Sequence, residues 1–320
     1  MTTYKRLTVK ECADALCKAE NVAVMIHVRP DGDAVGSAAA LCNILKQLGK
    51  DAKILSSDKI PDRLQFILDY TETELTDNAD GRTAIAIDVA SPAQLGTLWD
   101  GERAPVLMID HHAVGEQFAN GYIIPEASSA AEVLFDVALT LQDEGKIKLT
   151  KKLSYALYCA MSSDTGCFSY SNTGPKTHRY AAMLLEGGVD AADINHRLFN
   201  SKTKEQITAE GFVASRLESA SGGKISYATV TIADRERLGL LEEHFDTAID
   251  VVRSRQGTKI AFVIKEIDKG KFKVSLRSTE LDVASVAAKF GGGGHLRAAG
   301  CTVFADTADE VKTIILPLLK

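Results

Sequence analysis

The feature that most constrains this chain is a set of strand-like apolar segments that end directly in aspartate or histidine. The segment "APVLMID" at 104–110 has the pattern of a buried strand, and it runs straight into Asp110, His111 and His112. Burying three polar groups at a strand end costs free energy unless hydrogen bonds or cations compensate for it. The chain must therefore fold so that other groups satisfy this triplet.

Strand-like and helix-like patterns alternate through residues 1–200. Buried strands are predicted at 21–28, 51–56, 83–89, 104–110 and 121–125. Helices are predicted at 8–20, 33–50, 128–145, 150–163 and 176–188. Thr8 and Glu11 have the spacing of a capping box, and Gly49 ends the second helical pattern. Because such alternation is typical of a parallel sheet, residues 1–200 are predicted to form a doubly wound α/β domain.

A second, smaller α+β domain is predicted at residues 223–320. Strand patterns cover 222–232, 258–267, 271–278 and 298–304, and helical patterns cover 282–290 and 307–319. The sequence "DKG" between the second and third of these strands is a hairpin signal. The amphipathic pattern at 203–219 and the glycine pair at 222–223 predict a linker helix over residues 201–222.

Length and composition fit a globular protein of about two domains, with 320 residues, 45% hydrophobic and 25% charged. The sequence has no run of about 18 apolar residues, so no membrane partner is expected. The N-terminus lacks the apolar core of a signal peptide. The six cysteines are scattered without a Cys-x-x-Cys pair, which argues against a zinc ribbon or a secreted disulfide scaffold. We therefore expect a cytoplasmic protein.

The net charge of −6 is unevenly distributed along the chain. Residues 224–320 carry 15 Lys and Arg against 13 Asp and Glu, whereas residues 1–223 carry 22 against 30. A protein that binds long nucleic acid normally has a basic stripe that releases counterions. The acidic first part therefore predicts a short anionic partner rather than a long duplex. The sequence leaves the oligomeric state open, including a homodimer.

Polar side chains follow three of the predicted strands, and one more aspartate ends a helical pattern. These residues are His27, Asp31, Asp33, Asp88, Asp110, His111, His112 and Asp164. Ligands bind beyond the carboxyl ends of the strands in open α/β sheets. Each residue alone also has a structural explanation as a turn former, a helix cap or a hydrogen-bonded core histidine. Together on one rim, however, so many carboxylates would repel and desolvate one another unless cations neutralise them.

The ligand set consists of carboxylate oxygens and imidazoles without thiolates. This set disfavours a structural zinc site and suits Mn²⁺, Mg²⁺ or a similar hard divalent ion. The ligands outnumber the needs of one ion. Two ions about 3.5–4 Å apart that share a bridging carboxylate would use them all, and such pairs catalyse phosphoryl transfer.

The segments "HVRPDGDAVGS", "IAIDVA", "MIDHHA" and "SSDTGCF" resemble, in order and spacing, the four motifs of the DHH phosphoesterase superfamily. The resemblance implies a hydrolase with two Mn²⁺ ions, for which Mg²⁺ or Co²⁺ could substitute. It implies that His27, Asp31 and Asp88 hold one ion. Asp33, Asp88, His111 and Asp164 would hold the other, with Asp88 as the bridge. It also implies catalytic roles for Asp110, which would orient its neighbours, and for His112, which would donate a hydrogen bond to the substrate phosphate.

The segment "KFGGGGHLRAAG" at 289–300 contains four consecutive glycines, which are unfavourable inside regular elements. It is either a flexible loop or a tight turn whose N–H groups approach a phosphate. Arg277 ends the predicted strand "VSLRS" and could pair with a phosphate, or it could be a solvated strand end. Lys265, Lys269, Lys271 and Lys273 flank it, and strand alternation would direct only some of them to the same face.

The glycine segment and Arg277 together resemble the DHHA1 domain that accompanies DHH domains. The resemblance implies that Arg277, Gly293, Gly294 and His295 bind a terminal substrate phosphate or carboxylate across a cleft from the metals. The active site would then lie between the two domains.

The two-domain size and the "GGGGHLRAAG" segment resemble the nanoRNase and pAp-phosphatase branch of the family. This resemblance implies degradation of RNAs of a few nucleotides from an end to mononucleotides, and removal of the 3′-phosphate of 3′-phosphoadenosine 5′-phosphate (pAp), giving AMP. Two alternatives stay open: a phosphodiesterase for pApA or cyclic di-AMP, and a nucleotide-binding sensor without turnover. The distance from the glycine segment to the metals would act as a ruler that favours short substrates.

Overall fold

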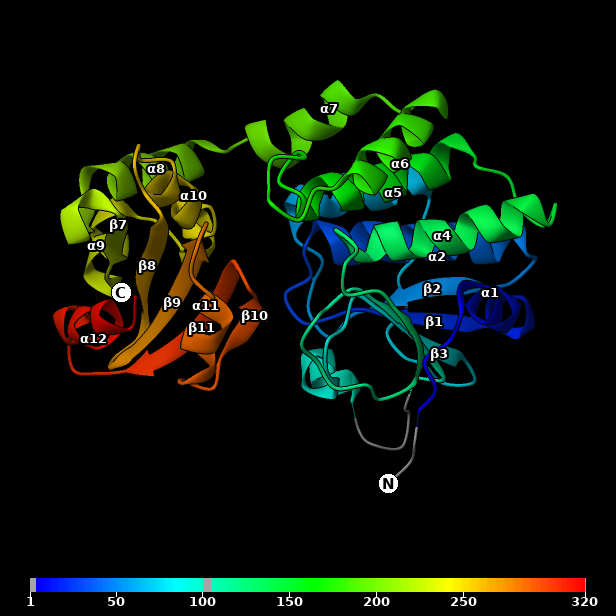
Figure 1. Cartoon of the computed structure of the whole chain (residues 1–320), viewed down its shortest axis with the longest axis horizontal. Coiled ribbons are helices and arrows are strands. Elements are labelled where there is room, and N and C mark those ends of the chain that lie inside the picture. The colour runs from blue at the N-terminus through cyan, green and yellow to red at the C-terminus, as the bar shows by residue number, and fades with distance from the viewer. Residues whose placement is uncertain (1–3, 100–104, 320) are drawn as a thin grey trace. The chain divides into compact units, whose positions relative to one another are not determined.

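The computed structural model describes residues 4–99 and 105–319. The chain divides into two compact units, Met1–Ser201 and Lys202–Lys320 (Figure 1). Each unit has its own sheet. Within the described residues, none of the helices combines the length and apolar character needed to cross a membrane.

The first unit contains a five-stranded sheet in the order β2-β1-β3-β4-β5. Its strands are β1 Val22–Met25, β2 Ala52–Leu55, β3 Thr83–Ile87, β4 Leu107–Asp110 and β5 Asn120–Ile123. All four strand pairs are parallel, which confirms the predicted parallel sheet. β1 and β3 end earlier than predicted because the residues after Met25 and Ile87 leave the sheet and form the loops that carry the polar side chains, whereas β4 ends at Asp110 as predicted.

The predicted helices of the first unit are all present, within a few residues of their expected ends. The unit contains α1 Val9–Lys18, α2 Gly32–Gln47, α3 Gln65–Thr71, α4 Ala130–Asp143, α5 Lys151–Asp164, α6 Pro175–Glu186 and α7 Ala191–Asn195, with the short turns η1 Asp62–Leu64, η2 Pro92–Leu98 and η3 His196–Asn200. The capping box at Thr8 and Glu11 forms as predicted.

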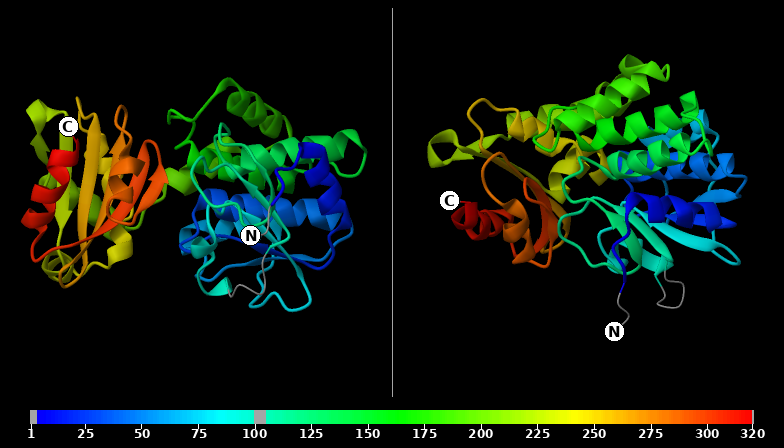
Figure 2. Two further views of the ribbon diagram at one scale, coloured as in Figure 1. Left: turned by 60° about the horizontal axis from the view of Figure 1, so that its bottom comes forward. Right: turned by 45° about the vertical axis from the view of Figure 1, so that its right-hand side comes forward.

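The two faces of this sheet are covered differently. Val22 and Val24 of β1 pack into the larger apolar cluster with α1, α2, α4 and α5. Figure 1 shows α2, α4 and α5 on one side of the strands, and Figure 2 gives two further views of this unit. Ala23 and Met25 point to the other face, where Leu95 of η2 and Phe118 cover them. The second face is thus covered by a short 3₁₀ helix and loops.

Close packing of α2 against α5 brings distant acidic residues together. A Cβ atom on Gly36 would lie 2.8 Å from the carbonyl oxygen of Ala156, and one on Gly32 would lie 2.3 Å from Oγ of Ser163. Glycine at these positions therefore lets the start of α2 touch the end of α5. Since Asp33 lies at that start and Asp164 ends α5, the contact brings both carboxylates to one place.

The second unit contains a six-stranded mixed sheet in the order β10-β11-β9-β8-β7-β6. Its strands are β6 Glu218–Ala220, β7 Ile225–Val230, β8 Ile260–Asp268, β9 Lys271–Ser278, β10 Gly293–His295 and β11 Ala298–Phe304. Its helices are α8 Lys204–Ser215, α9 Ile232–Leu238, α10 Ala248–Arg253, α11 Val283–Ala288 and α12 Ala308–Ile315, with the turns η4 Ser221–Gly223, η5 Glu242–Phe245 and η6 Leu316–Leu319. β8 and β9 form the hairpin that "DKG" predicts.

The segment predicted as a linker over 201–222 contains α8 and β6. The buried side chains of α8, Ala209 and Val213, pack with Ala228 of β7, Phe245 and Val252. The division between the units falls at Ser201–Lys202, so α8 is part of the second unit. The predicted apolar face of this helix is only partly used, because Ile207 is exposed while Ala209 and Val213 are buried.

Candidate active site

The candidate site lies at the carboxyl ends of β1, β3 and β4. The strand order places β1 between β2 and β3, which makes the gap between β1 and β3 the point where the chain direction across the sheet reverses. Ligands of open α/β sheets bind outside such a point. His27, Asp31 and Asp33 follow β1, Asp88 follows β3, and His111 follows β4. The fold thus brings together side chains from four separate parts of the sequence, with Asp164 at the end of α5 as the fourth.

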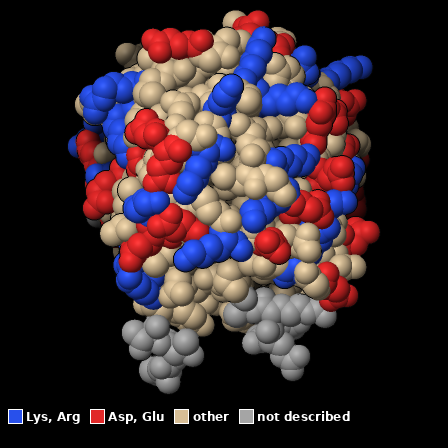
Figure 3. Space-filling model, turned by 90° about the vertical axis from the view of Figure 1, so that its right-hand side faces the viewer, with Lys and Arg blue, Asp and Glu red and all other residues tan. Residues whose placement is uncertain are grey.

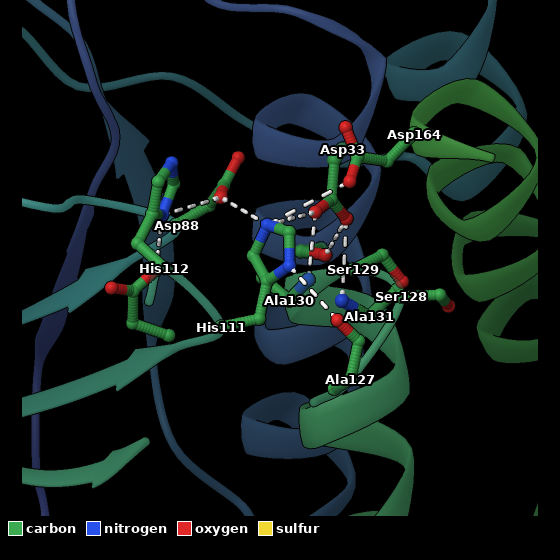
Figure 4. Close-up of polar contacts among 12 residues, drawn as sticks. Asp33, Asp88, His111, His112, Ala127, Ser128, Ser129, Ala130, Ala131 and Asp164 are labelled. Carbon is green, nitrogen blue, oxygen red and sulfur yellow. Dashed lines mark hydrogen bonds and ion pairs between the residues drawn. The ribbon is translucent and has the colours of Figure 1, made fainter. Parts of the chain in front are cut away.

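Two groups of ligand atoms meet at Asp88. In the first group, Nε2 of His27 lies 3.8 Å from Oδ1 of Asp31 and 3.6 Å from Oδ2 of Asp88. In the second group, Nε2 of His111 lies 3.6 Å from Oδ1 of Asp88. It also lies 3.8 Å from Oδ2 of Asp33 and 3.7 Å from Oδ2 of Asp164 (Figure 4). The two oxygens of Asp88 therefore face different groups.

The backbone of Asp88 adopts an unusual conformation. Its φ angle is +57°, in the left-handed region that non-glycine residues rarely occupy, and the side chain is almost fully buried. Such backbone costs about 1–3 kcal/mol and occurs mainly where function requires it. The N–H of Asp88 donates to the carbonyl oxygen of Ile109, which holds this turn at the end of β4.

Hydrogen bonds orient both imidazoles. Nδ1 of His27 lies 2.8 Å from the carbonyl oxygen of Val28, and Nδ1 of His111 lies 3.2 Å from that of Ala127. Each Nδ1–H therefore donates to a carbonyl, and each Nε2 is left facing the carboxylates. Metal-ligating histidines are commonly fixed in this way.

Burial and mutual repulsion perturb the titration of the cluster. Burial raises the pKa of Asp33, and the charges of Asp88 and Asp164 raise it further. Burial also raises the pKa of Asp164, to about 7. Burial would lower the pKa of His27, but the carboxylates of Asp31 and Asp88 outweigh it and raise this pKa to about 11. Protons on these side chains therefore offset part of the negative charge of the cluster when no metal ion is bound.

The geometry fits divalent metal ions. The ligand atoms form three groups in which all atoms lie within 4.8 Å of one another: His27, Asp31 and Asp88; Asp33, His111 and Asp164; and Asp88, His111 and His112. Among residues 4–99 and 105–319, the basic side chains that pair with these aspartates are histidines rather than Lys or Arg. Buried carboxylates without a fixed cation suit a bound metal, and the oxygen-rich donors suit a hard ion.

Asp110 and His112 form a hydrogen-bonded pair at the edge of this cluster, and Nδ1 of His112 also lies 3.8 Å from Oδ1 of Asp88. Nδ1 of His112 lies 2.7 Å from Oδ1 of Asp110, whose side chain is buried at the end of β4. Burial would lower the pKa of His112, but the bond with Asp110 raises it. The bond occupies Nδ1, so Nε2 of a protonated His112 can donate to another group.

Asp31 and Asp33 also have the structural roles that sequence reasoning offered as alternatives. Oδ1 of Asp31 accepts from the N–H groups of Asp33 and Ala34, so this residue caps α2. Oδ2 of Asp33 accepts from the N–H of Ala130 at the start of α4. Capping therefore fixes the carboxylates without excluding them from a metal site.

Comparison with known proteins agrees with this geometry. A family model described as "DHH family, N-terminal domain" matches residues 21–161, and one for the DHHA1 domain matches residues 222–316. The bifunctional oligoribonuclease and PAP phosphatase NrnA of Thermus thermophilus is 30% identical over 304 residues, which cover 93% of this chain and 88% of that protein.

The chain belongs to the DHH family.

Two further comparisons extend over almost the whole chain. The Bacillus subtilis protein with the same NrnA name is 25% identical over 297 residues, covering 92% of this chain and 93% of that protein. An exopolyphosphatase-related protein from Bacteroides fragilis has a TM-score of 0.85 at 23% identity, covering 96% of this chain and 94% of the other. The second likeness shows that the fold is shared across both units.

The DHHA1 domain places the glycine segment in a strand rather than in a loop. Gly293, Gly294 and His295 form β10, which pairs antiparallel with β11. A Cβ atom on Gly292 would lie 2.2 Å from the carbonyl oxygen of Gly300, and Gly294 has a φ of +139°. These two glycines are therefore needed by the strand pairing itself. A Cβ atom on Gly293 would meet nothing within 4 Å, so the unit's own packing does not require glycine there.

Arg277 lies on the same sheet, near the glycines. It pairs across the ladder with Ala298 of β11, which in turn pairs with His295. Nη1 of Arg277 donates to the carbonyl oxygen of Leu276. The side chain of His295 lies outside the described part of the structure. The predicted substrate-binding residues of this domain thus lie on β9 and β10, the two strands on either side of β11.

The structure resolves which flanking lysines share a face with Arg277. Lys271 and Lys273 are an even number of residues from Arg277 on β9, so their side chains lie on the same face of the sheet as Arg277. Lys265 of β8 is the cross-strand partner of Lys273 and shares that face. Lys265 is buried and lies 3.2 Å from Oδ1 of Asp246, so its charge is used within the unit. Lys269 lies in the turn between β8 and β9.

Sequence reasoning missed the backbone groups that support the site. The carbonyl of Ala127 and the N–H groups of Ala130 and Ala131 contact His111 and Asp33 (Figure 4). The signal that could have found this segment is the pair Ser128–Ser129 followed by Glu132, which has the pattern of a helix start.

Proposed function

We propose that this protein is a Mn²⁺-dependent phosphohydrolase. Its proposed substrates are RNAs of a few nucleotides, degraded from an end to mononucleotides, and pAp, which would give AMP. The names of the NrnA relatives support this substrate class. The residues proposed as ligands are His27, Asp31, Asp33, Asp88, His111 and Asp164.

The observation that carries the proposal is the orientation of Asp88. Its Oδ2 faces His27 and its Oδ1 faces His111, at 3.6 Å in each case. A carboxylate so placed can bridge two ions, and metal pairs that share a ligand are characteristic of phosphoryl transfer. When bound, such a pair activates water and neutralises charge on the phosphoryl group.

His112 is the proposed donor to the substrate. The bond from its Nδ1 to Asp110 fixes the orientation of the imidazole and favours the protonated form. Nε2 can then hold a proton and donate it to a phosphoryl oxygen, where negative charge increases during hydrolysis. Asp110 acts through His112 by holding it in this orientation.

In the DHHA1 domain, Arg277, Gly293, Gly294 and His295 are proposed to bind the anionic end of the substrate. Gly293 is exposed and a Cβ there would meet nothing within 4 Å, so a phosphate could approach the backbone at this point. Arg277 lies on β9, separated from β10 by β11, and its guanidinium could pair bidentately with phosphate. Figure 3 shows one face of the molecule, on which basic and acidic side chains are intermixed. That face therefore has no continuous basic stripe of the kind that long nucleic acid requires.

A substrate panel tests the proposal. Metal-stripped protein would be assayed with and without Mn²⁺, Mg²⁺ or Co²⁺ on pAp, pApA, cyclic di-AMP, RNA dimers to pentamers and a 24-mer. We expect Mn²⁺-dependent release of phosphate from pAp and of mononucleotides from the short RNAs. Binding of these nucleotides without turnover under all metals would contradict a hydrolase and favour a sensor. Turnover of cyclic di-AMP or pApA, without turnover of pAp or short RNAs, would instead identify a phosphodiesterase for these dinucleotides.

A further inference from the structure

The segment Ala127–Ala131, which follows β5 and includes the first two residues of α4, contacts two of the proposed metal ligands through its backbone. The carbonyl oxygen of Ala127 accepts from Nδ1 of His111 at 3.2 Å. The N–H groups of Ala130 and Ala131 donate to Oδ2 and Oδ1 of Asp33 at 2.7 and 3.2 Å (Figure 4). We call residues 127–131 the brace segment.

The same segment is tied to a third ligand through Asn172. Nδ2 of Asn172 donates to the carbonyl oxygen of Ser128 at 2.9 Å and to that of Asp164 at 3.1 Å. Asn172 lies in the turn after α5 and so connects the end of that helix to the brace segment. Asp33, His111 and Asp164 are the members of one candidate metal group.

Glu132 fixes the brace segment from the other side. Its carboxylate is almost fully buried, and Oε2 accepts from Oγ of Ser128 at 2.6 Å and from Oγ1 of Thr177 at 2.7 Å. The N–H of Ser128 also donates to it, at 3.4 Å. Loss of any one of these partners would leave a buried polar group unsatisfied, which is costly. The network therefore fixes Ser128 relative to Glu132 of α4 and Thr177 of α6.

The other candidate metal group has separate supports. Nδ1 of His27 donates to the carbonyl oxygen of Val28, and Oδ1 of Asp31 accepts from the N–H groups at the start of α2. Asp88 is held by its N–H bond to Ile109. A change in the brace segment should therefore affect one group more than the other.

We propose that Glu132 and Asn172 are positioning residues for the metal ion bound by Asp33, His111 and Asp164. They set the affinity of that ion and leave the ion at His27, Asp31 and Asp88 nearly unaffected. This inference rests on the proposed two-metal function. The three ligands come from α2, from the residue after β4 and from the end of α5. Contacts with one common segment would keep their ligand atoms close together when the cation is absent.

The test is the affinity of each ion in metal-stripped protein. Mn²⁺ would be titrated into the wild type and into Asn172→Ala, Glu132→Ala and Thr177→Val, with free Mn²⁺ followed by its EPR signal. We expect two ions in the wild type. In Asn172→Ala and Glu132→Ala, one affinity should fall by about 10–100-fold and the other should change by less than about twofold. Thr177→Val removes one of the bonds to Glu132 and should give a smaller loss of the same kind.

Asn43→Ala is the matched control. Its amide oxygen accepts from Gln47 and Thr150 at the contact of α2 with α5, away from the brace segment. It should keep both affinities. If Glu132→Ala fails to fold, Asn172→Ala still decides, because Asn172 is exposed and its loss should leave the melting temperature unchanged.

Two results would overturn the inference: unchanged affinities in Asn172→Ala, or equal losses at both sites together with a lower melting temperature. A wild type that binds fewer than two ions would instead contradict the proposed function on which the inference rests. The two failures are therefore distinguishable.

Discussion

At the scale of single residues, Asp88 is the residue that lies between the two histidines of the candidate metal site. It is buried, has a left-handed backbone, and directs its two oxygens to different histidines. A core residue that served packing alone would have no reason to combine a backbone cost with a buried charge.

Replacing Asp88 by asparagine should remove most activity. Asn keeps the shape of the side chain but replaces one carboxylate oxygen by an amide group, so both ions lose charge and one loses a ligand atom. We expect the hydrolysis rate to fall by at least about 100-fold, corresponding to about 2.7 kcal/mol of transition-state stabilisation. The exposed Asp62→Asn is the control and should retain the wild-type rate. Retained activity in Asp88→Asn would argue against a bridging role.

Metal binding should release protons. In the metal-free protein the pKa of His27 is raised to about 11, so its imidazole is protonated at pH 7. A metal ligand must be the neutral form, so Mn²⁺ has to displace this proton, and the apparent affinity should rise as the pH rises from 6 to 8. Calorimetric titrations in two buffers of different ionisation enthalpy measure the number of protons released. Identical heats in both buffers would contradict the prediction.

The residues of the candidate metal site could be predicted from the sequence because their side chains follow apolar strands. Parallel strands bring their carboxyl ends to one edge, so His27, Asp88 and His111 had to be neighbours once the strands were assigned. The supporting carbonyl of Ala127 could not be predicted, because a backbone group has no residue-type signal. Its position depends on the length of the turn before α4.

At the scale of elements, the sequence predicted the longer helices and most strands, and the missed elements were short. β9 was predicted with the bounds that the structure has, and α4 and α5 were predicted to within two residues. The short helices α9 and α10 were missed because they have too few turns to show a period. β10 was missed because glycines disfavour strands, and their role there is close backbone approach.

Two glycines of this segment should respond differently to substitution. Gly292→Ala places a Cβ 2.2 Å from the carbonyl oxygen of Gly300 and should lower the free energy of unfolding by about 1–3 kcal/mol. Gly293→Ala meets open space and should leave stability within about 0.5 kcal/mol, but it should raise KM if a phosphate approaches there. Denaturant unfolding and steady-state kinetics measure the two effects. An unchanged KM in Gly293→Ala would remove this glycine from the binding site.

At the scale of the whole molecule, the chain combines a unit with a candidate metal centre and a unit with candidate anion-binding residues. Family models match both units, and the sequence similarity to the two NrnA relatives extends over most of their length. Substitutions in the first unit should therefore mainly change kcat, and substitutions in the second unit should mainly change KM.

Arg277→Ala tests this division. The guanidinium is proposed to bind the substrate away from the metals, so its loss should raise KM by about 10-fold or more while changing kcat much less. The rise in KM should be largest for short RNAs, which we expect to be the best substrates of the wild type. Lys269→Ala, in the turn between β8 and β9, is a control that removes a nearby positive charge and should change neither constant. A fall in kcat alone for Arg277→Ala would place the residue in the chemical step.

The most direct test of the account is anomalous diffraction from crystals of the protein soaked in Mn²⁺. The account predicts two manganese peaks about 3.5–4 Å apart on either side of the Asp88 carboxylate, one beside His27 and one beside His111. A single peak, or no peak at this carboxylate, would contradict it.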